Sequence, residues 1–374
     1  MFTSMKIRKA LLLSALLLLT FSSLATAQTK RKVMPTGTPV LWRDPGDIST
    51  RDLRYGAGSA ELAPVAPFTF LREEPGGSSP KFRVRDGRGV EWTVKVGVEA
   101  QAETVSTRLV WAMGYFADED YYLDRVEVKN LPRLSRGQEF VEAGGFVRGA
   151  RFEPKRPEAV RGEIWDWLKN PFVGTREFDG LKVLMVLLAN YDTRLENNRI
   201  IYQKNPETGQ MEARYVVTDI GATLGHVGGL GGMRVKNNLE HFMMTKFIVG
   251  VQNGLVEFDY STTPKGAGKF ASIFSPGYGK SQANKEKAMR RIPVENARWI
   301  GQMLSRLSDE QWRDAFRAAG YDNTTMEGFI RTLRERITGS PVYLSNSDVS
   351  RLCRLCMRGI IFEKEEGSSI HDTP

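Results

Sequence analysis

The chain has 374 residues and a formal net charge of +9, with 41% hydrophobic and 26% charged residues. This composition supplies enough apolar material for a core, and it excludes an intrinsically disordered chain and a polytopic membrane protein. Two cysteines exclude a disulfide-stapled scaffold, and three histidines leave little room for a histidine-rich metal site. The basic residues are dispersed along the chain, so we expect no nucleic-acid partner.

Residues 1–27 have the pattern of a secretory signal peptide. A basic start that includes Lys6 precedes an apolar run from Ala10 to Phe21, and the small residues Ala25-Thr26-Ala27 follow. The apolar run is too short for a membrane-spanning helix, which needs roughly 20 residues. We therefore expect cleavage near Ala27 and an exported protein, periplasmic or secreted, with no stable membrane span after cleavage.

An extended entry segment is expected over residues 28–66, followed by a strand-rich lobe over residues 67–150. The stretches FTFLRE, KFRVRD and EWTVKVG alternate apolar and polar residues around turn signals, which predicts three antiparallel strands. Apolar residues then recur with helical spacing over 99–114, and Gly114 is a natural end for that helix. Two further strands are expected in YYLDRVEVKN and EAGGFVRGARFE.

Residues 151–345 are expected to form a mainly helical lobe, and 346–374 a tail. GEIWDWLKNPF (162–172) predicts a short amphipathic helix, and the almost wholly apolar LKVLMVLLAN (181–190) predicts a buried one. RIIYQ and ARYVVTD predict a hairpin, and the glycine-rich residues 221–236 predict a mobile loop. A capping box at Ser308 opens a helix that stops at Gly320, and another helix ends near Gly339. The predicted fold class is α+β with two lobes.

A set of polar residues lies at the ends of these elements, in an order suited to phosphoryl transfer. Lys95 lies within a strand, and Asp192 opens the polar loop after the buried helix. Asn197 comes five residues later, and Asp219 follows the strand YVVT. Phosphoryl transfer needs a lysine on the phosphates, an aspartate near the attacking hydroxyl, and amide and carboxylate oxygens for metal ions.

These stretches resemble the motifs of protein kinases. WTVKV is similar to the V-A-I-K strand, Asp192-x-x-x-x-Asn197 has the spacing of H-R-D-x-x-x-x-N, and Asp219-Ile220-Gly221 resembles D-F-G. NYDTRLENNRII followed by VVTDIGATLG is closer to the atypical and phosphatidylinositol 3-/4-kinase-like kinases. The resemblance covers about residues 65–340 and implies a kinase-like fold in two lobes.

The resemblance implies that ATP binds at the strand-rich lobe. Lys95 would contact the ATP phosphates, with Glu103 or Glu99 as its ion-pair partner, and the loop with Gly76 and Gly77 would cover the phosphates. That loop departs from the family pattern, since it reads PGGSSPK in place of G-x-G-x-x-G. The two glutamates also follow the lysine more closely than in ordinary protein kinases.

The same resemblance implies the catalytic and metal-binding residues. Asp192 would be the catalytic base, and Asn197 and Asp219 would bind Mg²⁺ or Mn²⁺, with Asn198 as an alternative to Asn197. The acceptor would be a hydroxyl on a protein, a lipid head group or a sugar. Here too the sequence departs from the family, because Asn190-Tyr191 replaces His-Arg and no A-P-E-like segment is evident.

Other interpretations stay open. The chain could be a pseudokinase-like binding module without turnover, or an exported hydrolase in which Asp192, Asn197 and Asp219 bind metal and activate water. A kinase predicts Lys95 facing Asp219 with a helix glutamate in reach, whereas a hydrolase would leave Lys95 far from the acids. Cys353 and Cys356 form a C-x-x-C that fits either a local disulfide or simple packing.

Overall fold

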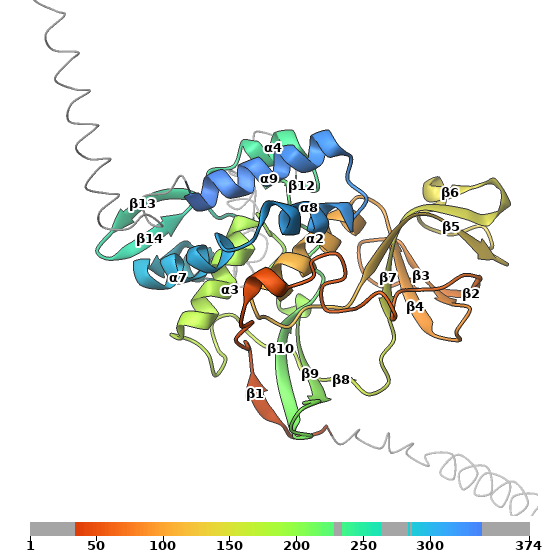
Figure 1. Cartoon of the computed structure of the whole chain (residues 1–374), viewed down its shortest axis with the longest axis horizontal. Helices are drawn as coiled ribbons and strands as arrows, with labels where there is room; N and C mark the ends of the chain where they lie inside the picture. Colours follow the sequence, from red (N-terminus) through yellow and green to blue (C-terminus); the bar gives the residue numbers. More distant parts are fainter. Residues whose placement is uncertain (1–33, 228–233, 263–282, 285, 339–374) are drawn as a thin grey trace, which may run out of the picture. The chain divides into compact units, whose positions relative to one another are not determined.

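A computed structural model describes residues 34–227, 234–262, 283–284 and 286–338 (Figure 1). The expected signal peptide and the tail with its two cysteines lie outside the described residues. Every described helix and strand belongs to one compact unit that begins at Thr36. No helix in these described ranges is both long and apolar enough to span a bilayer.

The largest sheet has the strand order β4-β3-β2-β5-β7-β6, and β7 also pairs with β4, so five of its strands close into a ring. Its neighbours are antiparallel except for a short parallel pairing of β2 with β5. The three antiparallel strands expected before the first helix are confirmed as β2, β3 and β4. The strands are β2 (Phe68–Glu73), β3 (Lys81–Arg85), β4 (Glu91–Val96), β5 (Tyr121–Lys129), β6 (Val141–Glu142) and β7 (Phe146–Pro154).

Alternation along β3 and β4 separates an apolar face from a polar one. Phe82 and Val84 of β3 and Trp92 and Val94 of β4 are almost fully buried in a hydrophobic cluster that belongs to this sheet. Successive side chains of a strand point to opposite faces, so the intervening polar residues lie together on the other face. That second face forms one wall of the candidate site.

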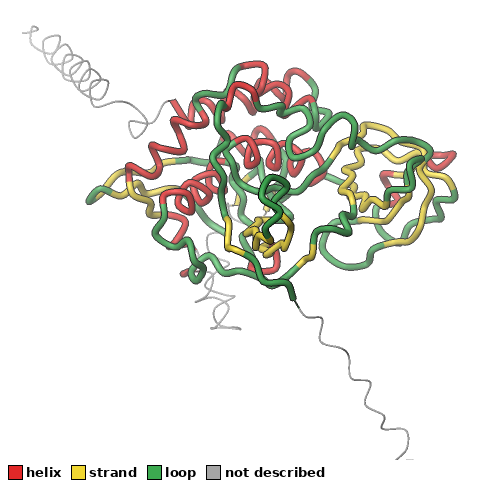
Figure 2. Tube along the Cα trace, turned by 60° about the horizontal axis from the view of Figure 1, so that its bottom comes forward, coloured by secondary structure: helices red, strands yellow, loops and turns green. Residues whose placement is uncertain are grey.

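Helix α2 (Glu99–Ala112) follows β4 directly and contacts β4, β5 and β7 on one side and α8 on the other. It ends just before Gly114, whose φ of +89° lies in the left-handed region, so both the predicted helix and its stop are confirmed. Figure 2 shows most helices gathered apart from the large sheet. The remaining α-helices are α3 (Arg176–Leu187), α4 (Leu239–Met243), α7 (Val294–Leu304), α8 (Asp309–Arg317) and α9 (Asn323–Thr338).

The described residues also form three smaller sheets, with the orders β1-β10-β9-β8, β11-β12 and β13-β14-β15. The expected hairpin is confirmed as β9–β10, and the entry segment adds β1 alongside β10 in parallel. Short 3-10 turns are η1 (Ile48–Thr50), η2 (Gln138–Phe140), η3 (Ala143–Gly145) and η4 (Leu195–Asn197). The strands are β1 (Thr38–Val40), β8 (Val160–Arg161), β9 (Asn198–Lys204), β10 (Met211–Val217), β11 (His226–Val227), β12 (Arg234–Val235), β13 (Ile248–Gln252), β14 (Leu255–Phe258) and β15 (Arg291–Pro293).

The helix predicted over residues 162–172 is wrong, because this stretch is loop and turn. Trp165 and Trp167 are both buried in the same core, with ring centroids 4.8 Å apart. Residues two apart point in nearly opposite directions on a helix, so burying both side chains together requires extended backbone. The Trp165 indole also donates a hydrogen bond to the carbonyl of Val216 at 3.0 Å.

The other predicted elements of the C-terminal half are present. The buried helix is confirmed as α3, and the capping box at Ser308 and the stop at Gly320 (φ +68°) are confirmed around α8. Of the predicted mobile loop, the ends pair as β11 and β12, and residues 228–233 lie outside the described residues. The described fold is α+β.

Candidate active site

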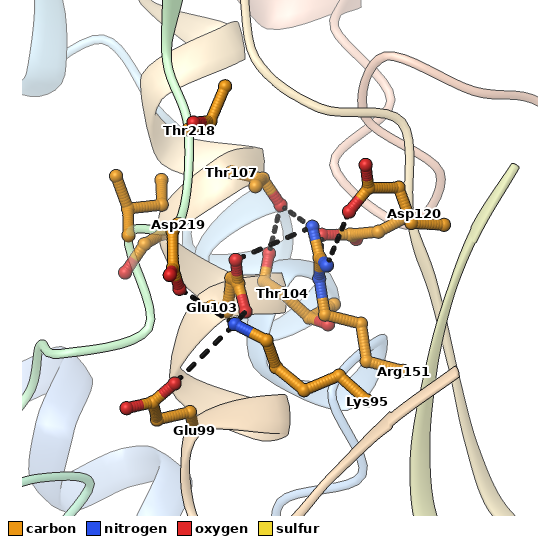
Figure 3. A network of polar contacts seen from close by, with 12 residues as sticks. Lys95, Glu99, Glu103, Thr104, Thr107, Asp120, Arg151, Thr218 and Asp219 are labelled. Atoms are coloured by element: carbon orange, nitrogen blue, oxygen red, sulfur yellow. Dashed lines mark hydrogen bonds and ion pairs between the residues drawn. The ribbon is translucent and has the colours of Figure 1, made fainter. Parts of the chain in front are cut away.

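Lys95 lies at the centre of a group of carboxylates that come from separate segments (Figure 3). Its Nζ is 2.7 Å from Glu103 Oε2 and 2.7 Å from Asp219 Oδ1, and it is 3.4 Å from Glu99 Oε2. The Lys95 side chain is 8% exposed. The structure therefore brings together four of the residues that the sequence predicted for one site.

The acids around Lys95 determine its charge. Burial alone would lower the pKa of Lys95, but the carboxylates of Glu103 and Asp219 outweigh burial and raise that pKa well above its ordinary value. Burial would raise the pKa of Asp219, yet the Lys95 ammonium holds it below its ordinary value. At neutral pH Lys95 is a cation and Asp219 an anion.

Local geometry explains why the acids converge. Glu99 and Glu103 lie four residues apart on α2, so they share one face of the helix. Asp219 has a φ of +54°, in the left-handed region, which turns the chain sharply after β10. A Cβ at Gly221 would lie 2.8 Å from Glu99 Cβ, so glycine lets this turn approach α2 closely.

A second group of buried charges supports the first. Arg151 Nη2 lies 3.7 Å from Glu103 Oε1, and Arg151 Nε donates to Asp120 Oδ2 at 2.8 Å. Asp120 also pairs with Arg108, whose Nη1 is 2.8 Å from Asp120 Oδ1. The side chains of Arg108, Asp120 and Arg151 are at most 2% exposed. The glutamate that holds Lys95 is thus itself held by a buried arginine.

Of these residues, Lys95, Glu103, Arg151 and Asp219 line a cavity of about 330 Å³. Every described residue on its wall is polar or charged. Its cations are Lys81, Arg83, Lys95, Arg151 and Arg161, and its acids include Asp219, Glu103 and Glu153. A cavity with this lining suits a ligand made of charged groups.

Asn197 lies on the same wall as Asp219. Its backbone carbonyl accepts hydrogen bonds from the N–H and the hydroxyl of Thr218, at 2.7 and 3.0 Å, next to Asp219 in sequence. Its side-chain Nδ2 donates to the carbonyl of Asp192 at 2.8 Å. Asn198 does not line the cavity, because it is fully buried and donates to the carbonyl of Trp165. Of the two asparagines, Asn197 is the one placed for a ligand.

Asp192 is placed differently from the other predicted residues. It is not among the described residues that line the cavity. Arg194 holds both of its carboxylate oxygens, through Nε at 2.5 Å and Nη2 at 2.8 Å. Its role as a catalytic base stays a prediction.

The glycines of the β2–β3 loop are also not on the cavity wall. Gly77 has a φ of +82°, and its carbonyl accepts a hydrogen bond from Arg136 at 2.9 Å. Gly76 has open space around it. The loop contacts the site through Ser79, whose hydroxyl donates to Glu99 Oε2, and Glu99 also pairs with Lys236.

Sequence reasoning missed the cations that flank Lys95, namely Lys81, Arg83 and Arg151. The alternation of KFRVR was a usable signal, since it places Lys81 and Arg83 on the polar face of β3. Arg151 could not be found in this way, because its place beside Lys95 depends on the pairing of β4 with β7. Within the described ranges, no group of three or more His, Cys, Asp or Glu side chains could hold a metal ion.

No protein-family model matches the chain, and no curated protein matches it. Solved structures that resemble it include the Helicobacter pylori proinflammatory kinase CtkA, with a TM-score of 0.40 and 12% identity over 74% of this chain and 95% of that one. A Golgi casein kinase has a TM-score of 0.27 and 9% identity, over 74% of this chain and 76% of the other. Both are kinases, but with TM-scores this low neither likeness carries an inference about this chain's activity.

Proposed function

We propose that the chain is a kinase-like phosphotransferase that moves the terminal phosphate of ATP to a hydroxyl acceptor. The observation that carries the proposal is the position of Lys95, with Glu103 and Asp219 each 2.7 Å from its ammonium. A lysine held by a helix glutamate and close to an aspartate on the wall of a polar cavity is an arrangement suited to phosphoryl transfer.

In this proposal, the residues of the chain bind and orient the phosphates. Lys95 would exchange its contact with Asp219 for a phosphate oxygen, while Glu103 keeps the ammonium charged and aimed into the cavity. Arg151 pairs with Glu103 and holds its carboxylate in place. Asp192 would accept the proton of the acceptor hydroxyl, which requires the pair with Arg194 to open. Positioning and charge supply most of the rate enhancement in such reactions.

The residues present fit a magnesium or manganese ion. Mg²⁺ is usually held by one or two carboxylates, several waters and the substrate phosphates, so a large acidic cluster is not required. Asp219 would supply a carboxylate oxygen and Asn197 its side-chain carbonyl, since its Nδ2 already donates to the backbone. When bound, the ion would neutralise negative charge on the phosphates.

We also propose the setting of this reaction. The signal-peptide pattern favours a protein that acts after export, and the acceptor would be a hydroxyl on a protein, a lipid head group or a sugar. The two-lobed arrangement and the relationship to atypical kinases are also part of this proposal. Residues 67–150 would carry the nucleotide-binding lobe and residues 151–345 the lobe with the D-x-x-x-x-N loop.

The hydrolase interpretation is disfavoured, because it predicts Lys95 far from the acids, whereas Lys95 Nζ lies 2.7 Å from both Glu103 and Asp219. The binding-module interpretation has one observation in its favour, the two-point hold of Arg194 on Asp192, which occupies both oxygens of the predicted base. Nucleotide binding without turnover would follow if that pair never opens. The two functions are separated by measuring phosphate transfer as well as binding.

The proposal is tested by thermal unfolding of the full chain with and without ATP and Mg²⁺ or Mn²⁺. A ligand that binds only the folded state adds about 2.7 kcal/mol at 100 times its Kd, which is an easily measured shift in Tm. We expect this shift in the wild type and its loss in Asp219→Ala. Asp44→Ala is the matched control, because Asp44 is exposed and does not line the cavity.

Labelled ATP then tests turnover. Transfer of label from the γ position to protein, lipid or sugar acceptors supports the phosphotransferase. A Tm shift without transfer to any acceptor leaves the binding module as the function. The absence of a shift with every nucleotide and metal would remove the proposal altogether.

A further inference from the structure

The wall of the cavity opposite Asn197 is made by two rows of side chains across three strands. In one row Lys81 of β3 lies opposite Lys95 of β4, and Lys95 lies opposite Arg151 of β7. Like charges directly opposite on one face of a sheet are destabilising. The carboxylates described above already compensate Lys95 and Arg151. Lys81 forms no ion pair among the described residues, so its charge is the one in this row that a negatively charged ligand would offset.

The second row places Arg83 opposite Thr93, and Thr93 opposite Glu153. Arg83 Nε is tied to Glu74 at 2.5 Å, which aims the rest of the guanidinium along the wall. Apart from the Glu153 carboxylate, which accepts a hydrogen bond from Arg151 Nη1 at 3.0 Å, the two rows cover one face of β3, β4 and β7 with groups that donate hydrogen bonds.

Two of these donors form no hydrogen bond. Arg83 Nη1 is a buried nitrogen without a hydrogen-bond partner, and Arg151 Nη2 forms no hydrogen bond although it lies 3.7 Å from Glu103 Oε1 as an ion pair. Among the residues that the structure describes, Lys81 and Arg161 form no ion pair. Buried N–H groups are costly to leave unsatisfied, so their presence on a cavity wall points to a ligand that accepts hydrogen bonds.

The same cavity offers nothing to the faces of a nucleotide base. A base binds by stacking on apolar or aromatic side chains, because its ring faces form no hydrogen bonds. None of the described residues that line this cavity is apolar or aromatic. Thr93, at the middle of the second row, lies between Arg83 and Glu153, so its neighbours on this face are charged.

We propose that the cavity recognises the triphosphate chain of its ligand and makes no stacking contact with a base. This inference rests on the proposed function and names its substrate class: a triphosphate chain with a divalent cation, carried by any nucleoside or present as inorganic tripolyphosphate. Lys81, Arg83 and Arg161 extend the phosphate site beyond Lys95. Arg83 Nη1 and Arg151 Nη2 donate hydrogen bonds to phosphate oxygens.

The test compares four probes on the full chain by calorimetry in the presence of Mn²⁺: ATP, GTP, inorganic tripolyphosphate and adenosine. A stacked base would favour ATP over tripolyphosphate by about tenfold or more. We expect the Kd values of ATP, GTP and tripolyphosphate to agree within about threefold, since no base contact distinguishes them. Adenosine should not bind.

Variants connect the binding to the wall. Lys81→Gln removes a cation that forms no ion pair among the described residues, so folding should be unchanged. We expect it to weaken ATP and tripolyphosphate by the same factor, as should Arg83→Gln. Arg85→Gln is the matched control on the same strand, because Arg85 is 52% exposed, pairs with Glu91 and does not line the cavity.

Each outcome decides a different claim. ATP binding at least tenfold tighter than tripolyphosphate, or measurable adenosine binding, overturns this inference and leaves the proposed function standing. Equal binding that Lys81→Gln and Arg83→Gln do not change also overturns it, because the phosphates then bind elsewhere. If neither ATP nor tripolyphosphate binds, the proposed function fails together with the inference.

Discussion

The buried charge of Lys95 is better explained by the proposed ligand than by a contribution to the stability of the fold. A buried ammonium loses its hydration, and its carboxylate partners repay that loss only when the geometry is good. Replacing a buried ion pair by apolar residues of similar volume is often neutral or stabilising. Lys95 nevertheless lies between Glu103 and Asp219 with 8% of its side chain exposed. The proposed role of Lys95 in holding phosphate would account for this buried charge.

Asp118 should give the folded protein a measurable pH dependence. Burial, and secondarily the charge of Glu153, raise its pKa from 3.8 to about 8, although Arg151 and Arg161 act in the opposite direction. Between these two values the folded chain holds a proton that the unfolded chain has released. The free energy of unfolding contributed by Asp118 therefore falls as the pH rises from about 4 to about 8.

Urea unfolding of Asp118→Asn across this range checks that prediction. Asparagine stays neutral, so the variant should lose less stability than the wild type between about pH 5 and about pH 8. At about pH 5 the two proteins should be similar, since Asp118 is protonated there in the folded state. Parallel curves for variant and wild type would show that Asp118 titrates normally.

At the scale of elements, Gly114 couples the end of α2 to the entry segment. Arg43 donates its backbone N–H to the Gly114 carbonyl at 2.9 Å, and a Cβ at Gly114 would lie 2.2 Å from the carbonyl oxygen of Arg43. Gly89, in the turn between β3 and β4, has a similar φ of +84° but open space around it. The two glycines differ in what surrounds them and hardly at all in backbone conformation.

We therefore expect Gly114→Ala to be the more destabilising of the two substitutions. Both variants carry about 1–3 kcal/mol of backbone strain, because alanine disfavours positive φ. Gly114→Ala should lose about 1–3 kcal/mol more, since the methyl group meets backbone that cannot move aside cheaply. Chemical denaturation of the two variants side by side measures the difference. Equal losses would mean that the entry segment is not held at this turn.

The elements that could be predicted from the sequence are those set by local pattern. Helix α2 and the strands around Lys95 follow from periodicity and from glycine at the turns, and the spacing of Glu99 and Glu103 follows from the helix itself. The stretch 162–172 looked helical because its apolar residues fit a short helix, but tertiary burial of Trp165 and Trp167 overrode that local preference.

The part of the site that could not be predicted depends on pairing between distant strands. Arg151 is opposite Lys95 only because β7 pairs with β4 in one register, and a shift by one residue would turn Arg151 to the other face. The role of Asp192 stays a prediction. Its spacing to Asn197 resembles the kinase pattern, but Arg194, two residues away, contacts both of its carboxylate oxygens.

At the scale of the whole molecule, buried apolar side chains of the described residues form two clusters. One belongs to the large sheet, and the other contains the apolar face of α2 together with the later helices. Between them lies the ion-pair network of Asp120, which joins Thr107 and Arg108 of α2 to Arg151 of β7. A polar network thus connects the sheet to α2, which itself belongs to the helical cluster.

Asp120→Asn tests whether this network makes the two clusters unfold together. The variant leaves Arg108 and Arg151 buried without their shared carboxylate, which should cost about 3–5 kcal/mol. The loss should also weaken the coupling of the two clusters, since this network is a polar link between β7 and α2, beside the pair of Arg151 with Glu103. In the variant, hydrogen exchange followed by mass spectrometry should show β2–β4 opening at lower free energy than α7–α9. In the wild type we expect both regions to open at similar free energies.

Glu142→Gln is the control, because its partner Arg125 is 52% exposed and an exposed pair contributes about 0–1 kcal/mol. An equal fall in protection across both clusters would show that the apolar contacts of α2 alone couple them.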